Sequence, residues 1–334
     1  MTPLPPHPHN SPRIALVGAG LAGLSCATAL QAAGHSVVLF EKSRGPAGRM
    51  STRRGEDWQC DFGAQYFVAR DPAFLAEVQR WSDAGVAQPW QPRLGSFEGS
   101  RWKPSTTALV RHVGVPAMTA PAHWLAQGLQ VHAHLTVQTL ERTVDGWRLH
   151  CAEAGAPEAV FDTVLLAMPA PQALALLGDH APGLRAAAAG AGMCPCWALM
   201  LRFDAPLAWD LDAAFVNQGP LGWMARDSSK PGRPRHETWV LHATADWSQE
   251  HLEDDPADVA RAMLKAFADL GGAAPAAWTA HRWRYATHAP ALTEGCAWDA
   301  ATRLGLCGDW LHGGKVEGAW LSGQALARRV LQQR

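Results

Sequence analysis

The chain has 334 residues, a length that fits one large domain or two closely associated ones. Hydrophobic residues make up 48% of it, enough for a buried core, and the formal net charge is only −1. This balance excludes a strongly basic or acidic protein, so we expect no nucleic-acid partner. The seven cysteines are scattered and odd in number, which favours a reducing cytoplasm over a disulfide framework.

The first stretch, residues 1–12, is rich in Pro and His and has no apolar core. It predicts a disordered lead-in rather than a signal peptide. Residues 14–33 are almost uncharged, like a membrane span, but glycines interrupt them and a strand pattern follows. We therefore expect a buried strand and helix at this position, and no membrane.

The most informative motif is the glycine-rich turn Gly18-Ala19-Gly20-Leu21-Ala22-Gly23, which follows the apolar run 14–17. In such a turn Gly20 lets the backbone approach a pyrophosphate, and Gly23 lets the next helix pack closely. A predicted strand at 35–40 ends at Glu41, where a carboxylate accepts hydrogen bonds from ribose hydroxyls. This layout predicts a dinucleotide site; a strand–helix–strand unit without nucleotide is the alternative. The acid disfavours an NADP-type ribose phosphate, although Lys42 follows it.

A loop, a short strand and a helix come next. Arg49 lies in a loop rich in Gly and Arg, where it can pair with a phosphate through two hydrogen bonds; a solvated arginine is the alternative. Residues 61–67 predict a strand end that turns at Gly63. Asp71-Pro72 predicts the cap of a helix that runs to Asp83.

The middle of the chain alternates helices and strands and then becomes richer in strands. We expect a helix at 116–127, strands at 129–131, 137–142 and 147–151 with a hairpin turn at 145–146, one buried strand at 160–167, and a helix to 177. Beyond it we expect strands at 197–203 and 238–243, a helix at 256–270, and a strand at 280–285.

The end of the chain carries a second motif, Gly308-Asp309-Trp310 followed by 313–319, between a short strand at 304–307 and a helix at 316–331. A carboxylate at Asp309 can bind the hydroxyls of a ribityl chain. The N-terminus of the helix stabilises negative charge at the N1/O2 edge of a reduced flavin. An ordinary strand–loop–helix is the alternative for this motif alone, but with the glycine-rich turn it predicts one FAD.

Because motifs at both ends of the chain must meet one nucleotide, we expect a discontinuous α/β fold. Residues 1–70, 128–170 and 295–334 are assigned to a Rossmann-like FAD-binding domain. Residues 71–127 and 171–294 are assigned to an inserted, β-rich α+β substrate domain.

These motifs resemble the FAD-dependent amine oxidase superfamily, and specifically its bacterial renalase-like branch. The similar stretches are 17–23, 41–42, 48–52, 61–67 and 308–323, with weaker similarity at 239–243 and 281–285. The resemblance implies a fold like that of amine oxidases and p-hydroxybenzoate hydroxylase. No Cys lies in 313–318, so the covalent flavin attachment of monoamine oxidases is not expected.

The resemblance also implies cofactor residues, with FAD in contact with Ala22, Glu41, Lys42, Arg49, Ala64, Gln65, Val137, Asp309 and Val316, and with Ala64 and Gln65 beside the isoalloxazine. With the neighbouring motif positions, the candidate cofactor residues are Gly18, Gly20, Leu21, Ala22, Gly23, Glu41, Lys42, Gly48, Arg49, Met50, Gly63, Ala64, Gln65, Val137, Ala167, Met168, Gly308, Asp309, Val316, Gly318 and Ala319.

The substrate side has fewer signals. Only two tyrosines are present, Tyr66 and Tyr285, so the paired-tyrosine cage of amine oxidases is not evident. Trp223, Trp283 and Tyr285 are candidates for an aromatic wall, with core packing as the alternative for each Trp; His242 is a candidate for the pocket or for the core. Arg226, Lys230 and Arg233 form a basic cluster in a loop that either binds substrate phosphates or is solvated. The candidate substrate residues are Trp223, Arg226, His242, Trp283 and Tyr285.

No metal site is expected, because His132 and His134 lack a third ligand and Cys194 and Cys196 lack a second pair.

The renalase-like resemblance implies an oxidase that takes hydride from isomeric dihydro-NAD(P) onto FAD and reduces O2 to H2O2. An amine oxidase of the same fold is one alternative, and a non-catalytic flavin-binding redox sensor is another. A nicotinamide-dependent dehydrogenase ranks last, because it leaves Asp309 and Gly318 without a role. Hydride transfer depends on stacking the donor carbon against the flavin and excluding water, so it needs little acid–base help.

Overall fold

The computed structural model describes residues 12–155, 159–288 and 292–332, so residues 1–11 of the expected lead-in lie outside the described part. The chain divides into two compact units. Unit 1 comprises Met1–Gly48, Ala122–Gly192 and His288–Arg334, and unit 2 comprises Arg49–Pro121 and Met193–Thr287. The units differ from the expected boundaries mainly at residues 49–70, which belong to unit 2, and at residues 171–192, which belong to unit 1.

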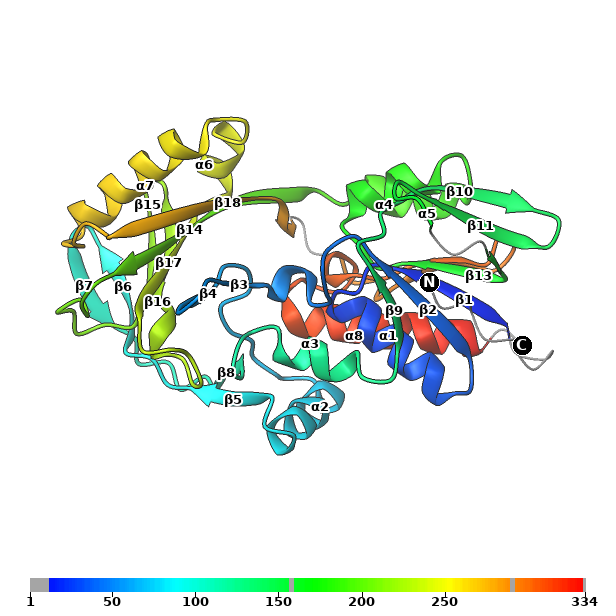
Figure 1. Ribbon diagram of the computed structural model, residues 1–334, viewed down its shortest axis with the longest axis horizontal. Helices are drawn as coiled ribbons and strands as arrows, with labels where there is room; N and C mark the ends of the chain where they lie inside the picture. The colour runs from blue at the N-terminus through cyan, green and yellow to red at the C-terminus, as the bar shows by residue number, and fades with distance from the viewer. Residues whose placement is uncertain (1–11, 156–158, 289–291, 333–334) are drawn as a thin grey trace. The chain divides into compact units, whose positions relative to one another are not determined.

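Unit 1 is built on a six-stranded sheet with the order β19-β20-β13-β1-β2-β9 (Figure 1). Its strands are β1 (Arg13–Val17), β2 (Ser36–Glu41), β9 (Gln130–Ala133), β13 (Thr163–Leu166), β19 (Ala297–Asp299) and β20 (Leu304–Leu306). All neighbours are parallel except β19 and β20. The central strands are apolar and buried, as expected for a parallel sheet.

The first and last helices of unit 1 pack on each other. They are α1 (Leu21–Ala32) and α8 (Lys315–Leu331), so the helices predicted after both glycine motifs are confirmed. The Ser25 hydroxyl donates to the carbonyl oxygen of Trp320 at 2.8 Å, and the Gln324 amide donates to the carbonyl oxygen of Ser25 at 3.1 Å. Segments from opposite ends of the chain thus form one layer (Figure 1).

A smaller part of unit 1 corrects one prediction. The expected single strand at 160–167 is two strands in different sheets: β12 (Val160–Phe161) pairs with β11 (Gly146–Cys151), and β13 pairs with β1. Asp162 separates them because its carboxylate accepts from the Arg13 N–H at 2.7 Å. The hairpin between β10 (Val137–Thr143) and β11 is confirmed. Unit 1 also contains α4 (Ala170–Leu177) and α5 (Pro182–Ala189), the second of which was not predicted.

Unit 2 is built on a seven-stranded sheet with the order β18-β14-β17-β16-β15-β6-β7. Its strands are β6 (Leu94–Glu98), β7 (Arg101–Pro104), β14 (Met193–Phe203), β15 (Ala213–Gln218), β16 (Leu221–Arg226), β17 (Glu237–Ala243) and β18 (Ala277–His288). One face packs Trp239, Leu241 and their neighbours against α6 (Ala245–Glu250) and α7 (Pro256–Asp269). Because side chains alternate along a strand, Val240 and His242 belong to the other face.

Shorter elements complete unit 2. They are β3 (Thr52–Arg54), β4 (Gln59–Asp61), α2 (Pro72–Asp83), β5 (Ala87–Trp90), β8 (Arg111–Gly114) and the three-residue 3-10 turns η1 (Gly48–Met50) and η2 (Asp227–Ser229); η3 (Asp309–Leu311) lies in unit 1. The predicted cap of α2 is confirmed, since Asp71 accepts from the Ala73 N–H at 2.8 Å. The helix expected at 116–127 is only α3 (Ala120–Leu125), because the Met118 N–H is engaged by Asp61 at 3.1 Å. Within the described residues, no helix has the length and apolar character needed to cross a membrane.

Candidate functional site

The glycine-rich turn of unit 1 joins β1 to α1 and can only be built from small residues. Gly18 has φ +104°, and a Cβ there would overlap the carbonyl oxygen of Ala167; a Cβ on Gly23 would overlap the carbonyl oxygen of Gly18. Gly20 is the N-cap of α1, and neither a capping side chain nor an acidic residue occupies the first turn. The positive end of the helix is therefore left for an anion, which is what a pyrophosphate requires.

Glu41 connects the end of β2 to this turn. Its Oε2 accepts from the Ala19 N–H and its Oε1 from the Ser43 N–H, both at 2.8 Å, and only 6% of the residue is exposed. Each carboxylate oxygen can accept a second hydrogen bond. Glu41 therefore holds the turn in place and still has acceptor capacity for ribose hydroxyls.

The second motif lies beside the end of β13. The Trp310 indole donates to the carbonyl oxygen of Met168 at 3.0 Å, and the Gly308 N–H donates to the Ser322 hydroxyl at 2.9 Å. Asp309 is buried, with 7% exposed, and its carbonyl oxygen accepts from the Gly314 N–H at 2.8 Å. No side chain caps α8 at Gly314, but an acidic residue, Glu317, lies in the first turn of this helix.

The parallel register explains why these candidates meet. The carboxyl ends of β1, β2, β13 and β20 lie at one edge of the sheet, and each is followed by candidate residues. Unit 1 thus contains Gly18, Gly20, Leu21, Ala22, Gly23, Glu41, Lys42, Gly48, Val137, Ala167, Met168, Gly308, Asp309, Val316, Gly318 and Ala319. Unit 2 contains Arg49, Met50, Gly63, Ala64 and Gln65 together with all five substrate candidates.

Three of the cofactor candidates of unit 2, Gly63, Ala64 and Gln65, lie on a tight turn, which we call the 61–65 turn. The Ala64 N–H donates to the carbonyl oxygen of Arg49 at 2.9 Å, and a Cβ on Gly63 would overlap that same oxygen. The Arg49 guanidinium donates to the carbonyl oxygen of Ala286 at 3.1 Å. Among the described residues, none accepts a hydrogen bond from the backbone N–H of Gly63 or Gln65, so the turn has donors left for a ligand.

Two substrate candidates converge on this turn. The indole N–H of Trp283 lies 3.0 Å from the carbonyl oxygen of Phe62, and Nε2 of His242 lies 3.1 Å from the same oxygen. The rings of Phe62 and Trp283 stack with centroids 5.1 Å apart, and His281 packs edge-on against both rings. Trp283 therefore packs in a mainly aromatic group with Phe62 and His281.

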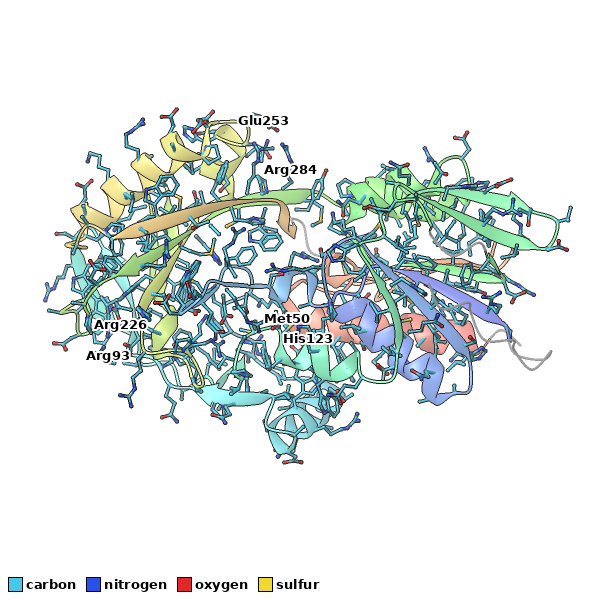
Figure 2. All side chains as sticks on the ribbon, viewed as in Figure 1. Met50, Arg93, His123, Arg226, Glu253 and Arg284 are labelled. Atoms are coloured by element: carbon cyan, nitrogen blue, oxygen red, sulfur yellow. The ribbon has the colours of Figure 1, made fainter. Side chains whose placement is uncertain are left out.

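The remaining candidates divide between the two faces of the sheet. Trp223 stands opposite His242 in the register of β16 and β17, so the two side chains share a face of the sheet. The rings of Trp223 and Tyr66 pack together with centroids 5.7 Å apart. On β18, Trp283 and Tyr285 share one side, whereas Arg282 and Arg284 pair with Glu253 on the other. Figure 2 shows Arg284 beside Glu253.

Arg226 lies apart from the other substrate candidates. It stands opposite Trp239, on the helix-covered face, so the structure separates it from the other substrate candidates. Its guanidinium pairs with Glu237 at 3.0 Å and lies 3.6 Å from Asp212, which also binds Arg93 (Figure 2). Arg226 therefore links neighbouring strands through these ion pairs.

Lys230 and Arg233, the other members of the expected basic cluster, fit neither alternative, a phosphate site or a solvated loop. The side chains of Lys230 and Arg233 are 0% and 1% exposed, so they are neither solvated nor open to a phosphate. With Asp61 and Asp227 they form a buried ion cluster: Lys230 contacts Asp61 at 3.1 Å and Asp227 at 2.7 Å, and Arg233 pairs with Asp61. Pattern reasoning missed this cluster because its two halves are far apart in the sequence.

Burial and neighbouring charges shift the pKa values in this region. Burial, with a smaller effect of Lys230, lowers the pKa of His242 to about 4, so the ring is neutral at physiological pH. Burial alone would raise the pKa of Asp61, but Lys230 and Arg233 outweigh it and lower that pKa. Burial and repulsion from Asp61 raise the pKa of Asp227 to about 6.

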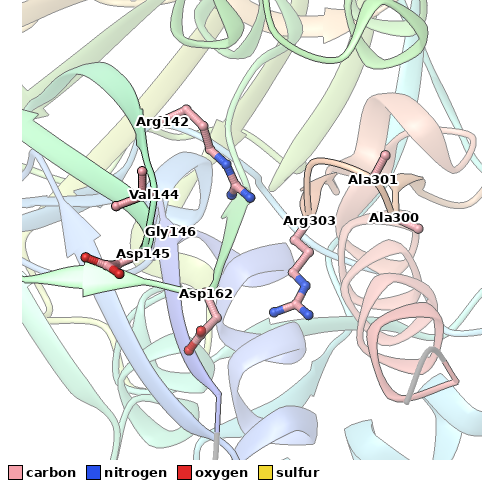
Figure 3. Close-up of a pocket in the computed structure, with 8 residues that line it drawn as sticks. All are labelled: Arg142, Val144, Asp145, Gly146, Asp162, Ala300, Ala301 and Arg303. Atoms are coloured by element: carbon pink, nitrogen blue, oxygen red, sulfur yellow. The ribbon is translucent and has the colours of Figure 1, made fainter.

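A polar pocket of about 420 Å³ lies elsewhere in unit 1 (Figure 3). It is lined by Arg142, Val144, Asp145, Gly146, Asp162, Ala300, Ala301 and Arg303, none of which is a candidate residue. Asp162 binds the first residue of β1, whereas the glycine-rich turn follows the last, roughly 16 Å along the strand. The pocket is therefore distinct from the edge that carries the motifs.

Comparison with known proteins identifies the family of the chain. Residues 16–80 match the NAD(P)-binding Rossmann-like domain, and residues 91–331 match the flavin containing amine oxidoreductases. Renalase of Mus musculus is 26% identical over 293 residues, which cover 82% of this chain and 84% of that protein. The L-amino-acid oxidase of Sistrurus catenatus edwardsii is 46% identical, but only over 54 residues, or 16% of this chain and 10% of that protein.

Solved structures show the same fold at low sequence identity. A putative protoporphyrinogen oxidase from Exiguobacterium sp. 255-15 has a TM-score of 0.79 and 13% identity, with 97% of this chain and 100% of that chain covered. Putrescine oxidase bound to putrescine has a TM-score of 0.72 and 12% identity, covering 96% and 99%. The family match spans most of the chain, and the chain therefore belongs to the flavin containing amine oxidoreductases, as a renalase-like, flavin-dependent oxidase.

Proposed function

We propose that the protein binds FAD without a covalent bond and oxidises isomeric dihydro-NAD(P), passing the electrons to O2. The observation that carries this proposal is the similarity to renalase over most of both chains. Bound FAD would supply a hydride acceptor that O2 reoxidises with formation of H2O2. We also infer a cytoplasmic location, supported by seven cysteines that are all free thiols.

The residues of unit 1 fit the adenosine and pyrophosphate parts of FAD. The glycine-rich turn ends at an uncapped helix, which suits a pyrophosphate, and Glu41 retains acceptor capacity for a ribose. Asp309 follows β20 and is the proposed acceptor for ribityl hydroxyls. No Cys lies between Gly313 and Gly318, which supports a non-covalent cofactor.

The residues of unit 2 fit a flat, uncharged hydride donor. Trp283 and Trp223 provide aromatic surface, and His242 and His281 are neutral at physiological pH because burial lowers the pKa of each to about 4. A dihydronicotinamide loses hydride without first losing a proton, so a face without a general base is sufficient. The chain's contribution is to orient the ring and exclude water.

Anaerobic stopped-flow mixing tests the proposal. The protein should be yellow and release intact FAD on acid or heat treatment. Isomeric dihydro-NAD(P) should bleach the flavin band quickly, whereas ordinary 4-dihydro-NADH and simple primary amines should act much more slowly. Flavin that stays on the precipitated polypeptide would contradict the non-covalent part.

An amine oxidase remains the second candidate, favoured by the family description and by the fold shared with putrescine oxidase. An amine must lose its proton before hydride transfer, so its rate of flavin reduction rises with pH. Faster bleaching by benzylamine than by the dihydronicotinamide isomers would replace our proposal with this one. Slow bleaching by every donor would instead favour a flavin-binding redox sensor.

A further inference from the structure

The buried ion cluster is connected to the 61–65 turn through one side chain, Gln65. Lys230 donates three hydrogen bonds: to Asp61 at 3.1 Å, to Asp227 at 2.7 Å and to Gln65 Oε1 at 3.1 Å. An ammonium group has three donors and no acceptor, so Lys230 is saturated. Its contact with Gln65 requires the amide oxygen, because the amide nitrogen carries only donors.

This contact fixes the direction of the Gln65 amide. With Oε1 on Lys230, Nε2 donates to the carbonyl oxygen of Asp61 at 2.7 Å and to that of Gly63 at 3.1 Å. A flipped amide would place its NH2 group against the ammonium and its oxygen against two carbonyl oxygens. Lys230 therefore determines how Gln65 closes the turn.

Other polar atoms of the 61–65 turn also have hydrogen-bond partners. The Asp61 carboxylate accepts from the Thr52 hydroxyl at 2.6 Å and the Met118 N–H at 3.1 Å, and the Phe62 carbonyl oxygen is bound as described above. The N–H groups of Gly63 and Gln65 remain, with no acceptor among the described residues. A turn with fixed carbonyls and open donors is arranged for a ligand that accepts hydrogen bonds.

We propose that Lys230 is a positioning residue, which acts through Gln65 to hold the backbone donors of the 61–65 turn in place for the flavin. The inference rests on the proposed function, since it takes the turn as part of the flavin site. It explains why two cations and two anions are buried together where an apolar contact would cost less desolvation. Asp227 balances the charge of Lys230, and Arg233 balances that of Asp61.

The test uses a charge-balanced variant, Lys230→Met with Asp227→Asn, which removes one cation and one anion and keeps the Asp61–Arg233 pair. Gln65→Met is the second variant. The triple variant combines all three substitutions and completes a thermodynamic cycle, which measures the coupling between the ion cluster and Gln65. Ser248→Ala is the control: its buried hydroxyl accepts from the Trp197 N–H at 3.1 Å within unit 2, apart from the cluster.

Two readouts do not depend on turnover. The first is the flavin midpoint potential, measured with a chemical reductant; we expect the double variant and Gln65→Met each to change the relative affinity for oxidised and reduced flavin about tenfold, or about 30 mV for a two-electron couple. The second is amide hydrogen exchange of peptides spanning 61–67, which should be at least tenfold faster in both variants. Ser248→Ala should change neither.

The triple variant should match Gln65→Met, because Lys230 acts through Gln65. A wild-type potential and exchange rate in the double variant, or further additive shifts in the triple variant, would overturn the inference. If the double variant does not fold, Gln65→Met alone tests the inference, because it leaves all four charges of the cluster in place. A wild-type potential and exchange rate in Gln65→Met would then refute the role of the amide. Failure of the proposed function would instead appear as wild-type flavin that the dihydronicotinamide isomers do not reduce, and both readouts remain measurable.

Discussion

Nε2 of His242 lies 3.1 Å from the carbonyl oxygen of Phe62, and because a carbonyl oxygen can only accept, this nitrogen carries the proton of the neutral ring. A second proton would have to go to Nδ1 and would place a cation in a partly buried position near Lys230. The pKa of His242 is accordingly lowered to about 4, first by burial. His242 thus links the stability of unit 2 to pH.

This link predicts a loss of stability on acidification. The unfolded chain takes up the His242 proton near pH 6.5, well above the folded pKa, so the contribution is complete above that value and is lost as pH falls toward 4. Between pH 7.5 and 5, the His242 contribution to the free energy of unfolding should fall by about 2 kcal/mol. Urea unfolding of wild type and His242→Gln, which keeps a donor for Phe62, measures it. Asp227, whose raised pKa acts in the opposite direction, is common to both proteins. Equal pH slopes would refute the assignment.

Glu41 should be required for FAD retention. Glu41→Arg replaces the ribose acceptor by a donor and removes the bonds to Ala19 and Ser43, so affinity should fall ten- to a hundred-fold or more, or about 1.5–3 kcal/mol. Glu41→Gln keeps one acceptor oxygen and should be milder. Flavin content after dialysis and dissociation constants from fluorescence should rank the affinity for FAD as highest in wild type, lower in Glu41→Gln and lowest in Glu41→Arg. Full FAD retention by Glu41→Arg would remove Glu41 from the site.

Trp283 should control the rate of flavin reduction rather than cofactor binding. Trp283→Ala removes the ring that stacks on Phe62, so reduction should slow at least tenfold and stability should fall by about 3 kcal/mol. Trp283→Phe keeps a ring but loses the donor to Phe62 and should be intermediate. Trp278, on the same strand and 40% exposed, supplies the control Trp278→Ala. Stopped-flow rates of flavin reduction test this prediction. A wild-type rate in Trp283→Ala would exclude stacking of the substrate on the Trp283 ring.

The buried ion cluster should tolerate balanced substitution better than single substitution. Lys230→Met alone leaves Asp61 and Asp227 with one cation and should cost about 3–5 kcal/mol, as for other broken buried pairs. Adding Asp227→Asn should recover part of that loss despite being a second change. Denaturant unfolding of the two variants measures the difference. A double variant that is less stable than Lys230→Met would show that charge balance is not what the cluster provides.

Elements defined by local chemistry were predictable from the sequence. α2 was predicted with its observed bounds, because Asp71-Pro72 caps it and its apolar positions repeat with helical period. The glycine-rich turn, the β10–β11 hairpin and α8 were found for similar reasons. By contrast, the boundary at Asp162 depends on a hydrogen bond from Arg13, which is distant in the sequence, so the apolar residues on both sides of Asp162 were predicted to form one strand.

The site shows the same division. Motif positions around Gly18 and Asp309 could be identified because their spacing reflects backbone geometry. The partners of Lys230 and Arg233 could not, since Asp61 precedes them by more than a hundred residues and no local pattern distinguishes a buried cation from a solvated one. The face on which Arg226 lies could not be predicted either, because it is fixed by the pairing of β16 with β17.

The packing of α1 against α8 has a consequence for biosynthesis. The helix that supplies the Trp320 carbonyl to Ser25 is translated long after α1, because the two residues are 295 positions apart in the sequence. Unit 1 therefore cannot finish folding until α8 has been translated, and α1 stays incompletely covered until then. Ribosome stalling or a premature stop upstream of Lys315 leaves that surface exposed, which makes the late nascent chain a substrate for chaperones and proteases.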